Sequence, residues 1–433
     1  MDKEILIEML NAADAGERLR AVRELKKLLD AGLIQAPVRE GYTNNHVHTT
    51  YSFSPYSPAK AVWMGTMSGL STVGIMDHDA ILGAEEFIEA GEILGIATTI
   101  GFEMRTDWSA TPLAGKRINN PDQITNAYIS AHGLPHGSIQ AADGYLRGIR
   151  MERGKRNREM VRKLNACVQA LGIDIDYEKD VVPLSCFEVG GEVTERHLLF
   201  SLTKKLTEKY GRGPGLVAAL QSALHMAFSP KQASLLSDTE ASPVIYEYDL
   251  LNVLKGSFIK EIYVEAAGGE TPPVQEAVDF IRSVGAIPSY CYLGDVGESP
   301  TGDKKAQKFE DDYLEELLET VKRIGFQAIA YMPSRNTMPQ LDRVKKLCAH
   351  LGFMQISGED INQPRQSFIC KQLKMPGFEH LIDTTWALVG HEISATKDPG
   401  KGMFADGRPL GPEEMEERIR EYKEIGLKSA AAE

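Results

Sequence analysis

Four strand-like runs in the first third of the chain each lead into side chains of a metal-binding type. These side chains are His46 and His48, the triplet Asp77-His-Asp79, Glu103 and His132. Residues two apart on a strand point to the same face, so His46 and His48 suit a single ion. In parallel βα barrels the C-terminal strand ends carry the active site. The pattern therefore predicts a metal site at the mouth of such a barrel.

Strands and amphipathic helices continue to alternate along the chain, which is typical of an α/β fold. Further strand-like runs lie at 71–76, 96–102, 126–131, 286–292, 326–332 and 353–357. Helical runs lie at 58–69, 83–95, 272–284, 311–324 and 338–351. Short strands separated by helices indicate parallel βα units. With the run before His48, about seven strands are expected, which predicts a distorted TIM-like (β/α)7 barrel.

A long helical block interrupts this alternation and divides the chain. Residues 1–40 are predicted to form an N-terminal helical extension, because apolar residues recur there at helical spacing. We expect the barrel in 41–137 and 250–433, and a helical insertion over its mouth in 138–249. The last barrel segment should end in a helix from Pro412 and a disordered, Ala-rich tail.

A basic run within the predicted insertion has two interpretations. Its members are Arg147, Arg150, Arg153, Lys155, Arg156, Arg158, Arg162 and Lys163. Such a run is usually a solvated helix face. Alternatively, it guides a phosphorylated substrate towards the mouth.

Composition narrows the class of protein. The chain has 433 residues, of which 25% are charged and 42% hydrophobic, so it is globular rather than disordered. Its net charge of −13 argues against binding to extended nucleic acid or to anionic membranes. No signal peptide or membrane-spanning run is expected. Five cysteines without a C-x-x-C pair favour a reducing, cytoplasmic location.

Four motifs resemble those of the PHP (polymerase and histidinol phosphatase) superfamily of metal-dependent phosphoesterases. They are His46-Val-His48, Met76-Asp-His-Asp79, Gly101-Phe-Glu103 and Gly358-Glu-Asp360. The resemblance covers about 41–137 and 250–370. It implies a distorted seven-stranded barrel with two or three divalent metals at its mouth. The predicted insertion is similar to that of small PHP phosphatases, in which a motif like Thr194-Glu-Arg-His197 opens a helix.

The chain departs from the family's pattern at four positions. Where the family has one aspartate and three histidines, this sequence has Phe53, Tyr292, Arg335 and Asn362. The chain is therefore identified as a divergent member in which several metal ligands are replaced.

The resemblance implies metal positions that are filled unevenly. The first is complete, with His46, His48, Glu103 and Asp360. The second shares Glu103 with His132 and lacks the histidine at position 292, where Tyr292, Cys291 or His136 is a candidate substitute. The third retains His78. One or two ions of Zn, Mn or Fe per chain are expected, since imidazole and carboxylate ligands suit all three.

Other side chains are assigned supporting roles. Asp77 is expected to hold a neighbouring histidine from behind, or else to cap the helix at 83–95. Four residues are candidates for binding substrate phosphate, namely Arg105, Arg196, Arg365 and Tyr292. His197 and Arg335 are candidate catalytic groups, Arg335 because it supplies positive charge where a metal ligand is lost. For each arginine, a surface ion pair is the alternative, and for His197 it is packing.

Three functions remain open at this point. The first is metal-dependent hydrolysis of a phosphomonoester or small phosphodiester by metal-activated water. Nucleotide-like molecules are among the candidate substrates. The second is a degenerate PHP protein that binds metal or phosphate without hydrolase activity. An amidohydrolase-type barrel also uses His-x-His on its first strand, but the triplet ending at Asp79 and the motif ending at Glu103 argue against it. A small phosphorylated substrate is the expected partner.

Overall fold

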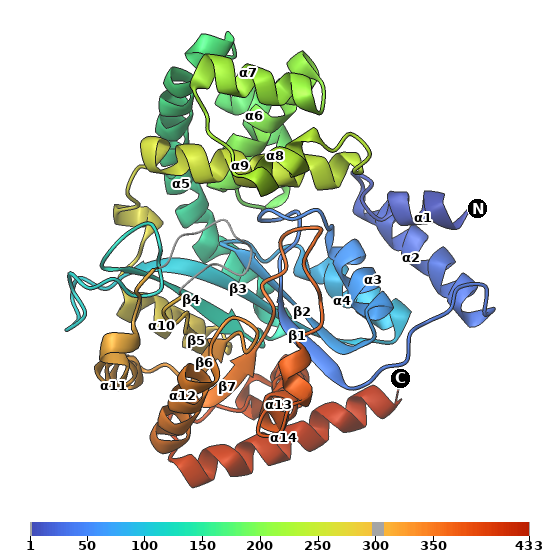
Figure 1. Cartoon of the computed structure of the whole chain (residues 1–433). Coiled ribbons are helices and arrows are strands. Elements are labelled where there is room, and N and C mark those ends of the chain that lie inside the picture. The colour runs from blue at the N-terminus through green and yellow to red at the C-terminus, as the bar shows by residue number, and fades with distance from the viewer. Residues whose placement is uncertain (1, 297–306, 433) are drawn as a thin grey trace.

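A single seven-stranded sheet, curled into a nearly closed barrel, forms the centre of the computed structural model, which describes residues 2–296 and 307–432. Its strands follow chain order: β1 (Tyr42–Val47), β2 (Leu70–His78), β3 (Ala97–Asp107), β4 (Asn126–His132), β5 (Ile287–Cys291), β6 (Ala328–Tyr331) and β7 (Met354–Ser357). A bridge between Val47 and Ile361, just beyond β7, brings the two edges together. The predicted distorted TIM-like barrel is confirmed (Figure 1).

The prediction of parallel strands is wrong for β4. This strand runs antiparallel to both β3 and β5, while the other neighbouring pairs are parallel. No helix joins β3 to β4, and a connection without a crossover helix returns the chain in the opposite direction. His132 therefore pairs with Gly101, whereas Glu103 pairs with Ser130. Although β4 runs in the opposite direction, His132 therefore lies close to the level of Glu103.

Helices cover the outside of the barrel. They are α3 (Pro58–Met67), α4 (Ala84–Leu94), α10 (Val274–Ser283), α11 (Leu314–Ile324), α12 (Met338–Leu351), α13 (Glu379–Lys397) and α14 (Pro412–Ala432), with α1 (Lys3–Met9) and α2 (Ala15–Asp30) alongside α4. Ser57 caps α3, and Gly95 ends α4 in a left-handed conformation. The predicted disordered tail is wrong, because α14 continues to Ala432.

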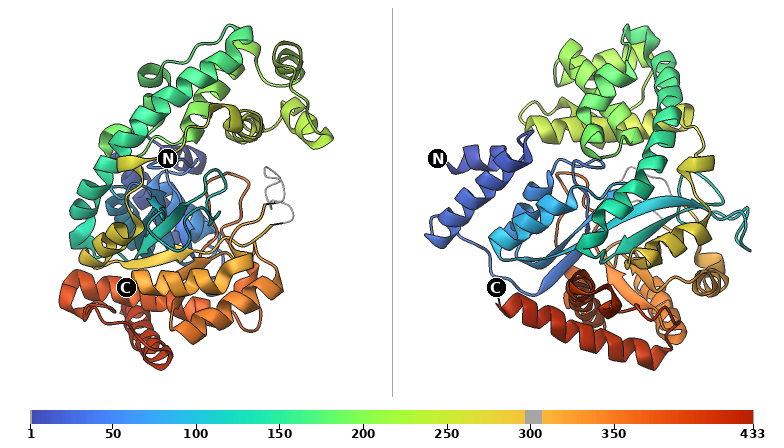
Figure 2. Two further views of the ribbon diagram at one scale, coloured as in Figure 1. Left: turned by 90° about the vertical axis from the view of Figure 1, so that its left-hand side faces the viewer. Right: turned by 180° about the vertical axis from the view of Figure 1, so that it is seen from behind.

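A layer of helices lies on the opposite side of the sheet from α13 and α14 (Figures 1 and 2). Its members are α5 (Ile139–Val168), α6 (Glu195–Tyr210), α7 (Pro214–Leu224), α8 (Pro230–Ser237) and α9 (Pro243–Ile262). They form a hydrophobic cluster of their own, which Phe53 joins from the barrel. Because α9 runs unbroken to Ile262, it crosses the predicted boundary at 249, and the three-part division stays a prediction. Among the described residues, no helix is long and apolar enough to span a membrane.

Candidate functional site

A cavity of about 230 Å³ lies between the barrel mouth and the layer of helices. Five of the predicted metal ligands line one side of it: His46, His48, His78, Glu103 and Asp360. We call these residues the ligand rim. They come from β1, β2, β3 and the segment after β7, which are brought together by closure of the barrel.

The donor atoms of the ligand rim are spaced as a metal ion requires. Nε2 of His48 lies 3.1 Å from Oδ1 of Asp360 and 3.5 Å from Oε1 of Glu103. Nε2 of His46 lies 3.5 Å from Oε2 of the same glutamate. Donors around a tetrahedral zinc ion, at about 2.1 Å from it, are separated by about 3.4 Å. Three residues of the predicted first position, His46, His48 and Asp360, therefore form a group that could hold one ion, and Glu103 lies 3.5 Å from both histidines.

His78 belongs to a second set of possible metal ligands in the same rim. Its Nδ1 lies 2.8 Å from Oε1 of Glu103, and it forms a possible metal-binding group with Glu103 and His48. The other possible group contains His46, His48 and Asp360. Since one imidazole nitrogen binds one ion, the two groups compete for Nε2 of His48.

Charge within the rim favours ionised carboxylates. Burial opposes the charge on Glu103, but His78 and His46 outweigh it and hold its pKa well below the usual value. Burial likewise opposes the charge on Asp360, and the hydrogen bond from His48 lowers its pKa. The pKa of His78 is raised, because Glu103 overcomes the effect of burial. A divalent cation would take the place of this positive charge between the carboxylates.

Asp77 supports the rim through a serine. Its carboxylate accepts hydrogen bonds from Oγ of Ser52 at 2.6 Å and from the hydroxyl and amide of Thr49 at 2.6 and 2.7 Å. The Ser52 oxygen lies 3.2 Å from Nδ1 of His48. Because the Ser52 proton goes to Asp77, Nδ1–H of His48 donates to Ser52 and Nε2 keeps its lone pair for an ion. The alternative of a helix cap is wrong, since Gly83 precedes α4.

The other side of the cavity carries His132, Cys291 and Tyr292, which we call the neutral rim. Burial lowers the pKa of His132 to about 3 and raises that of Cys291 to about 12. Burial, together with a 2.6 Å hydrogen bond to Asp311, also raises the pKa of Tyr292. All three side chains are thus uncharged at neutral pH. His132 belongs to neither possible metal group, and its Nε2 lies 3.1 Å from Oγ of Ser130.

The remaining replaced positions have partners of their own. Asn362 donates to Oδ1 of Asp360 at 2.7 Å and so steadies a rim carboxylate. Nε of Arg335 donates to the carbonyl of Leu293 at 3.0 Å, and Arg335 does not line the cavity. His136, the other candidate substitute, pairs with Glu392 at 3.0 Å outside the cavity.

Of the three arginines predicted to bind substrate, only Arg196 lines the cavity. It lies over the ring of Phe53, and its Nη1 is buried without a hydrogen-bond partner among the described residues. Arg105 pairs with Glu270, and Arg365 pairs with Asp249 at 2.8 Å. His197 packs edge-on against Phe53, and its Nδ1 accepts from the amide of Thr194 in a capping box at the start of α6.

Several cavity residues were not predicted as site residues. Lys255 of α9 and Glu195 of α6 form an ion pair of 3.4 Å at the cavity wall, and Arg153 of α5 lines it too. Glu195 adjoins Arg196 in the motif that opens α6, so that motif is the signal for it. Lys255 carries no local signal, because its placement depends on how α9 packs over the barrel.

Comparison with known proteins establishes the fold. No protein-family model matches the chain, and no curated protein matches it. A crystal structure of a protein from Bifidobacterium adolescentis, proposed to be a metal-dependent phosphoesterase, superposes with a TM-score of 0.50 at 16% identity, covering 76% of this chain and 91% of that one. An amidohydrolase from Chromobacterium violaceum, with bound sulfate and no metal, gives 0.49 at 16% identity over 76% and 89%. The first likeness shows a shared barrel fold.

Proposed function

We propose that this protein is a metal-dependent phosphoesterase that hydrolyses a phosphomonoester or small phosphodiester in the cavity at the barrel mouth. The observation that carries the proposal is the ligand rim, in which the donor atoms of His46, His48 and Asp360 lie within 4.8 Å of one another and Glu103 lies 3.5 Å from both histidines. The resemblance of their motifs to the PHP superfamily supports the choice of a phosphoester over other substrates.

In this proposal those four side chains hold one divalent cation, and His78 competes for the same donors or binds a second ion weakly. Zn, Mn and Fe all suit imidazole and carboxylate ligands. Such a cation polarises a phosphoryl oxygen and lowers the pKa of bound water towards about 7. The chain itself supplies the orientation, since Ser52 and Asp77 fix His48 and Asn362 fixes Asp360.

Substrate phosphate is proposed to contact the helical side of the cavity. Arg196 offers a buried guanidinium nitrogen without a partner, and Lys255 adds a second cation. A guanidinium can pair with phosphate through two parallel hydrogen bonds, and in this proposal the phosphorus lies between Arg196 and the ligand rim. Arg335 and His197 lie outside the cavity lining, so the proposal gives neither a catalytic role.

The test is a substrate panel with protein reloaded with Mn²⁺, Zn²⁺ or Fe²⁺. We expect release of nitrophenol from a nitrophenyl phosphate mono- or diester, and none from a nitrophenyl acetate or a nitroanilide. Glu103→Gln, purified in the same way, controls for contaminating phosphatases. Cleavage of the amide alone, or equal phosphatase activity in Glu103→Gln, would contradict the proposal.

The neutral rim favours a second candidate, a metal- or phosphate-binding protein without hydrolase activity. Tyr292 is held as a neutral phenol by Asp311, so it does not replace the missing histidine as an anionic ligand. If catalysis requires two ions, a chain that binds one ion would not hydrolyse its ligand. Metal and inorganic phosphate binding in calorimetry, with no turnover on any ester, would favour this candidate.

A further inference from the structure

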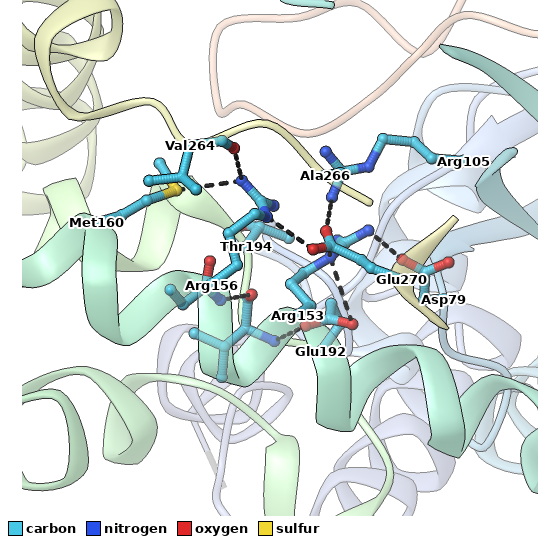
Figure 3. A network of polar contacts seen from close by, with 12 residues as sticks. Asp79, Arg105, Arg153, Arg156, Met160, Glu192, Thr194, Val264, Ala266 and Glu270 are labelled. Carbon is cyan, nitrogen blue, oxygen red and sulfur yellow. Dashed lines mark hydrogen bonds and ion pairs between the residues drawn. The ribbon is translucent and has the colours of Figure 1, made fainter. Parts of the chain in front are cut away.

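A buried cluster of charged side chains joins helix α5 to the barrel (Figure 3). Its members are Asp79, Arg105, Arg153, Arg156, Glu192 and Glu270, each at most 8% exposed. They come from the end of β2, from β3, from α5, from the segment before α6 and from the turn after α9. Burying charges is costly unless they are paired, and here all three arginines pair with Glu270 while Arg153 also pairs with Asp79.

Asp79 is the point at which this cluster meets the metal site. It directly follows His78, and its amide donates to the carbonyl of Glu103 at 2.8 Å. Its backbone has a φ of +46°, which is unfavourable for a residue with a side chain. Such a conformation persists only where the surroundings hold it, and contacts from α5 do so here.

Two arginines of α5 hold Asp79. Nη1 of Arg150 donates to its carbonyl at 2.9 Å, and Nη2 of Arg153 pairs with its carboxylate. Nε of Arg153 is fixed in turn by Glu270 at 3.2 Å. Glu270 also pairs with Arg105, which lies on β3 two residues beyond Glu103.

The basic run of α5 thus divides by face. Arg150, Arg153 and Arg156 recur every three residues, lie on one face of the helix and are buried. Arg158 and Arg162 pair with exposed glutamates. The inward face is buried rather than solvated, so the first sequence-based interpretation fails for it, while Arg153 lines the cavity and guidance of substrate stays a prediction.

We propose that Arg153 is a positioning residue of the metal site, acting through Asp79 on His78 and on the backbone of Glu103. The helical layer is then a structural part of the metal centre as well as a wall of the cavity. This inference rests on the proposed metal site. It requires that loss of the Arg153–Asp79 pair loosen two members of the ligand rim without removing any ligand.

The sign of the effect on metal affinity separates positioning from simple electrostatics. Arg153→Met removes a positive charge near a cation site, which by Coulomb's law alone would tighten metal binding. Positioning predicts the opposite. Loss of a group that orients a ligand weakens metal binding by about 10- to 100-fold. A shift of the visible absorption bands of the Co²⁺-loaded protein should accompany it, since the ligand geometry changes.

The experiment measures Co²⁺ and Zn²⁺ dissociation constants by competition with a chromogenic chelator. Arg158→Met is the matched control, because Arg158 lies on the same helix and pairs at the surface with Glu178. We expect weaker binding and a shifted spectrum for Arg153→Met, and wild-type values for Arg158→Met. Adding Asp79→Asn to Arg153→Met should weaken binding little further, because both act through one pair.

Unchanged or tighter metal binding in a folded Arg153→Met protein would overturn the inference, and so would a rise in KM alone, which would mean that Arg153 binds substrate. If Arg153→Met does not fold, Arg153→Lys gives the same readout with the charge kept, and we expect an intermediate loss of affinity. Wild-type protein that binds neither Co²⁺ nor Zn²⁺ would instead contradict the proposed function.

Discussion

The two sides of the barrel mouth have the same backbone framework and opposite chemistry. On the ligand rim, histidines and carboxylates point at one another at distances that suit an ion, and the histidines keep the buried carboxylates charged. On the neutral rim, burial leaves His132, Cys291 and Tyr292 uncharged, and hydrogen bonds occupy them. The difference teaches that ligand-type residues make a metal site only where opposite charges face one another.

This asymmetry has a consequence for the number of ions. An imidazole held neutral by burial still offers a lone pair, but His132 lies on the antiparallel strand, outside both possible metal groups. Among the described residues, the neutral rim therefore lines the cavity without belonging to a possible metal group. We infer one strongly bound ion, held by the ligand rim alone.

Breaking the ligand rim should have the largest effect. Glu103→Gln keeps the shape of the side chain but removes the charge that His46, His48 and His78 face. We expect loss of phosphoesterase activity on the order of 1,000-fold or more, because the site loses its central anionic ligand. Steady-state kinetics on the best ester of the panel measure it. Tyr292→Phe, on the neutral rim, is the control and should keep near wild-type kcat. Equal losses of activity in both variants would contradict the difference between the two rims.

Loosening the ligand rim from behind should have a smaller effect. Asp77→Asn weakens the hydrogen bonds from Ser52 and Thr49, so the orientation and tautomer of His48 are less well fixed. Loss of such support reduces metal affinity by about 10- to 100-fold. Chelator competition measures the dissociation constant. A wild-type constant in Asp77→Asn would show that His48 is fixed without this support.

Removing the arginine of the cavity wall should act on substrate and leave the metal unaffected. Arg196→Ala is expected to raise KM by about tenfold or more, since hydrogen bonds to a charged group contribute about 1.5–3 kcal/mol. Its metal affinity should match that of the wild type. Arg365→Ala, at a partly exposed pair with Asp249 outside the cavity, is the control and should leave KM unchanged. If the two variants behave alike, phosphate does not bind at Arg196.

The neutral rim should affect only how the free energy of unfolding changes at acidic pH. The folded-state pKa of His132 is about 3, below its unfolded value of about 6.5. Between these values the unfolded chain binds the proton, so stability is lost as pH falls below about 6.5. Between pH 7 and pH 5 the wild type should lose about 2 kcal/mol more than His132→Gln. Urea denaturation at the two pH values measures this, and equal losses would mean that His132 is charged in the folded protein.

The strand ends of the ligand rim were predictable because their signal is local. His48 directly follows β1, His78 ends β2 and Glu103 lies near the end of β3, and closure of the barrel brings the three side chains to one mouth. Asp360 followed from the motif alone, since its short strand resembles many others. The hydrogen bonds that orient His48 were predicted only in part. Asp77 was recognised as a supporting residue, but Ser52, which lies between Asp77 and His48, was not.

The neutral rim was poorly predicted because its chemistry depends on distant partners. The apolar pattern of β4 is the same in either direction, so the sequence did not reveal that His132 reaches the cavity from an antiparallel strand. Tyr292 was assessed without Asp311, which a separate segment supplies. Arg105 was predicted to bind substrate. Instead it pairs with Glu270, which lies 165 residues further along the sequence. Side chains paired over such separations require the fold to be known first.

Metal content of the purified protein tests the central claim most directly. Elemental analysis should be made on wild type, Glu103→Gln and Tyr292→Phe after identical reloading with Zn²⁺ or Mn²⁺ and removal of excess metal. We predict about one ion per chain in the wild type and in Tyr292→Phe, and essentially none in Glu103→Gln. No metal in the wild type, or retention of the ion in Glu103→Gln, would contradict a metal centre built on the ligand rim.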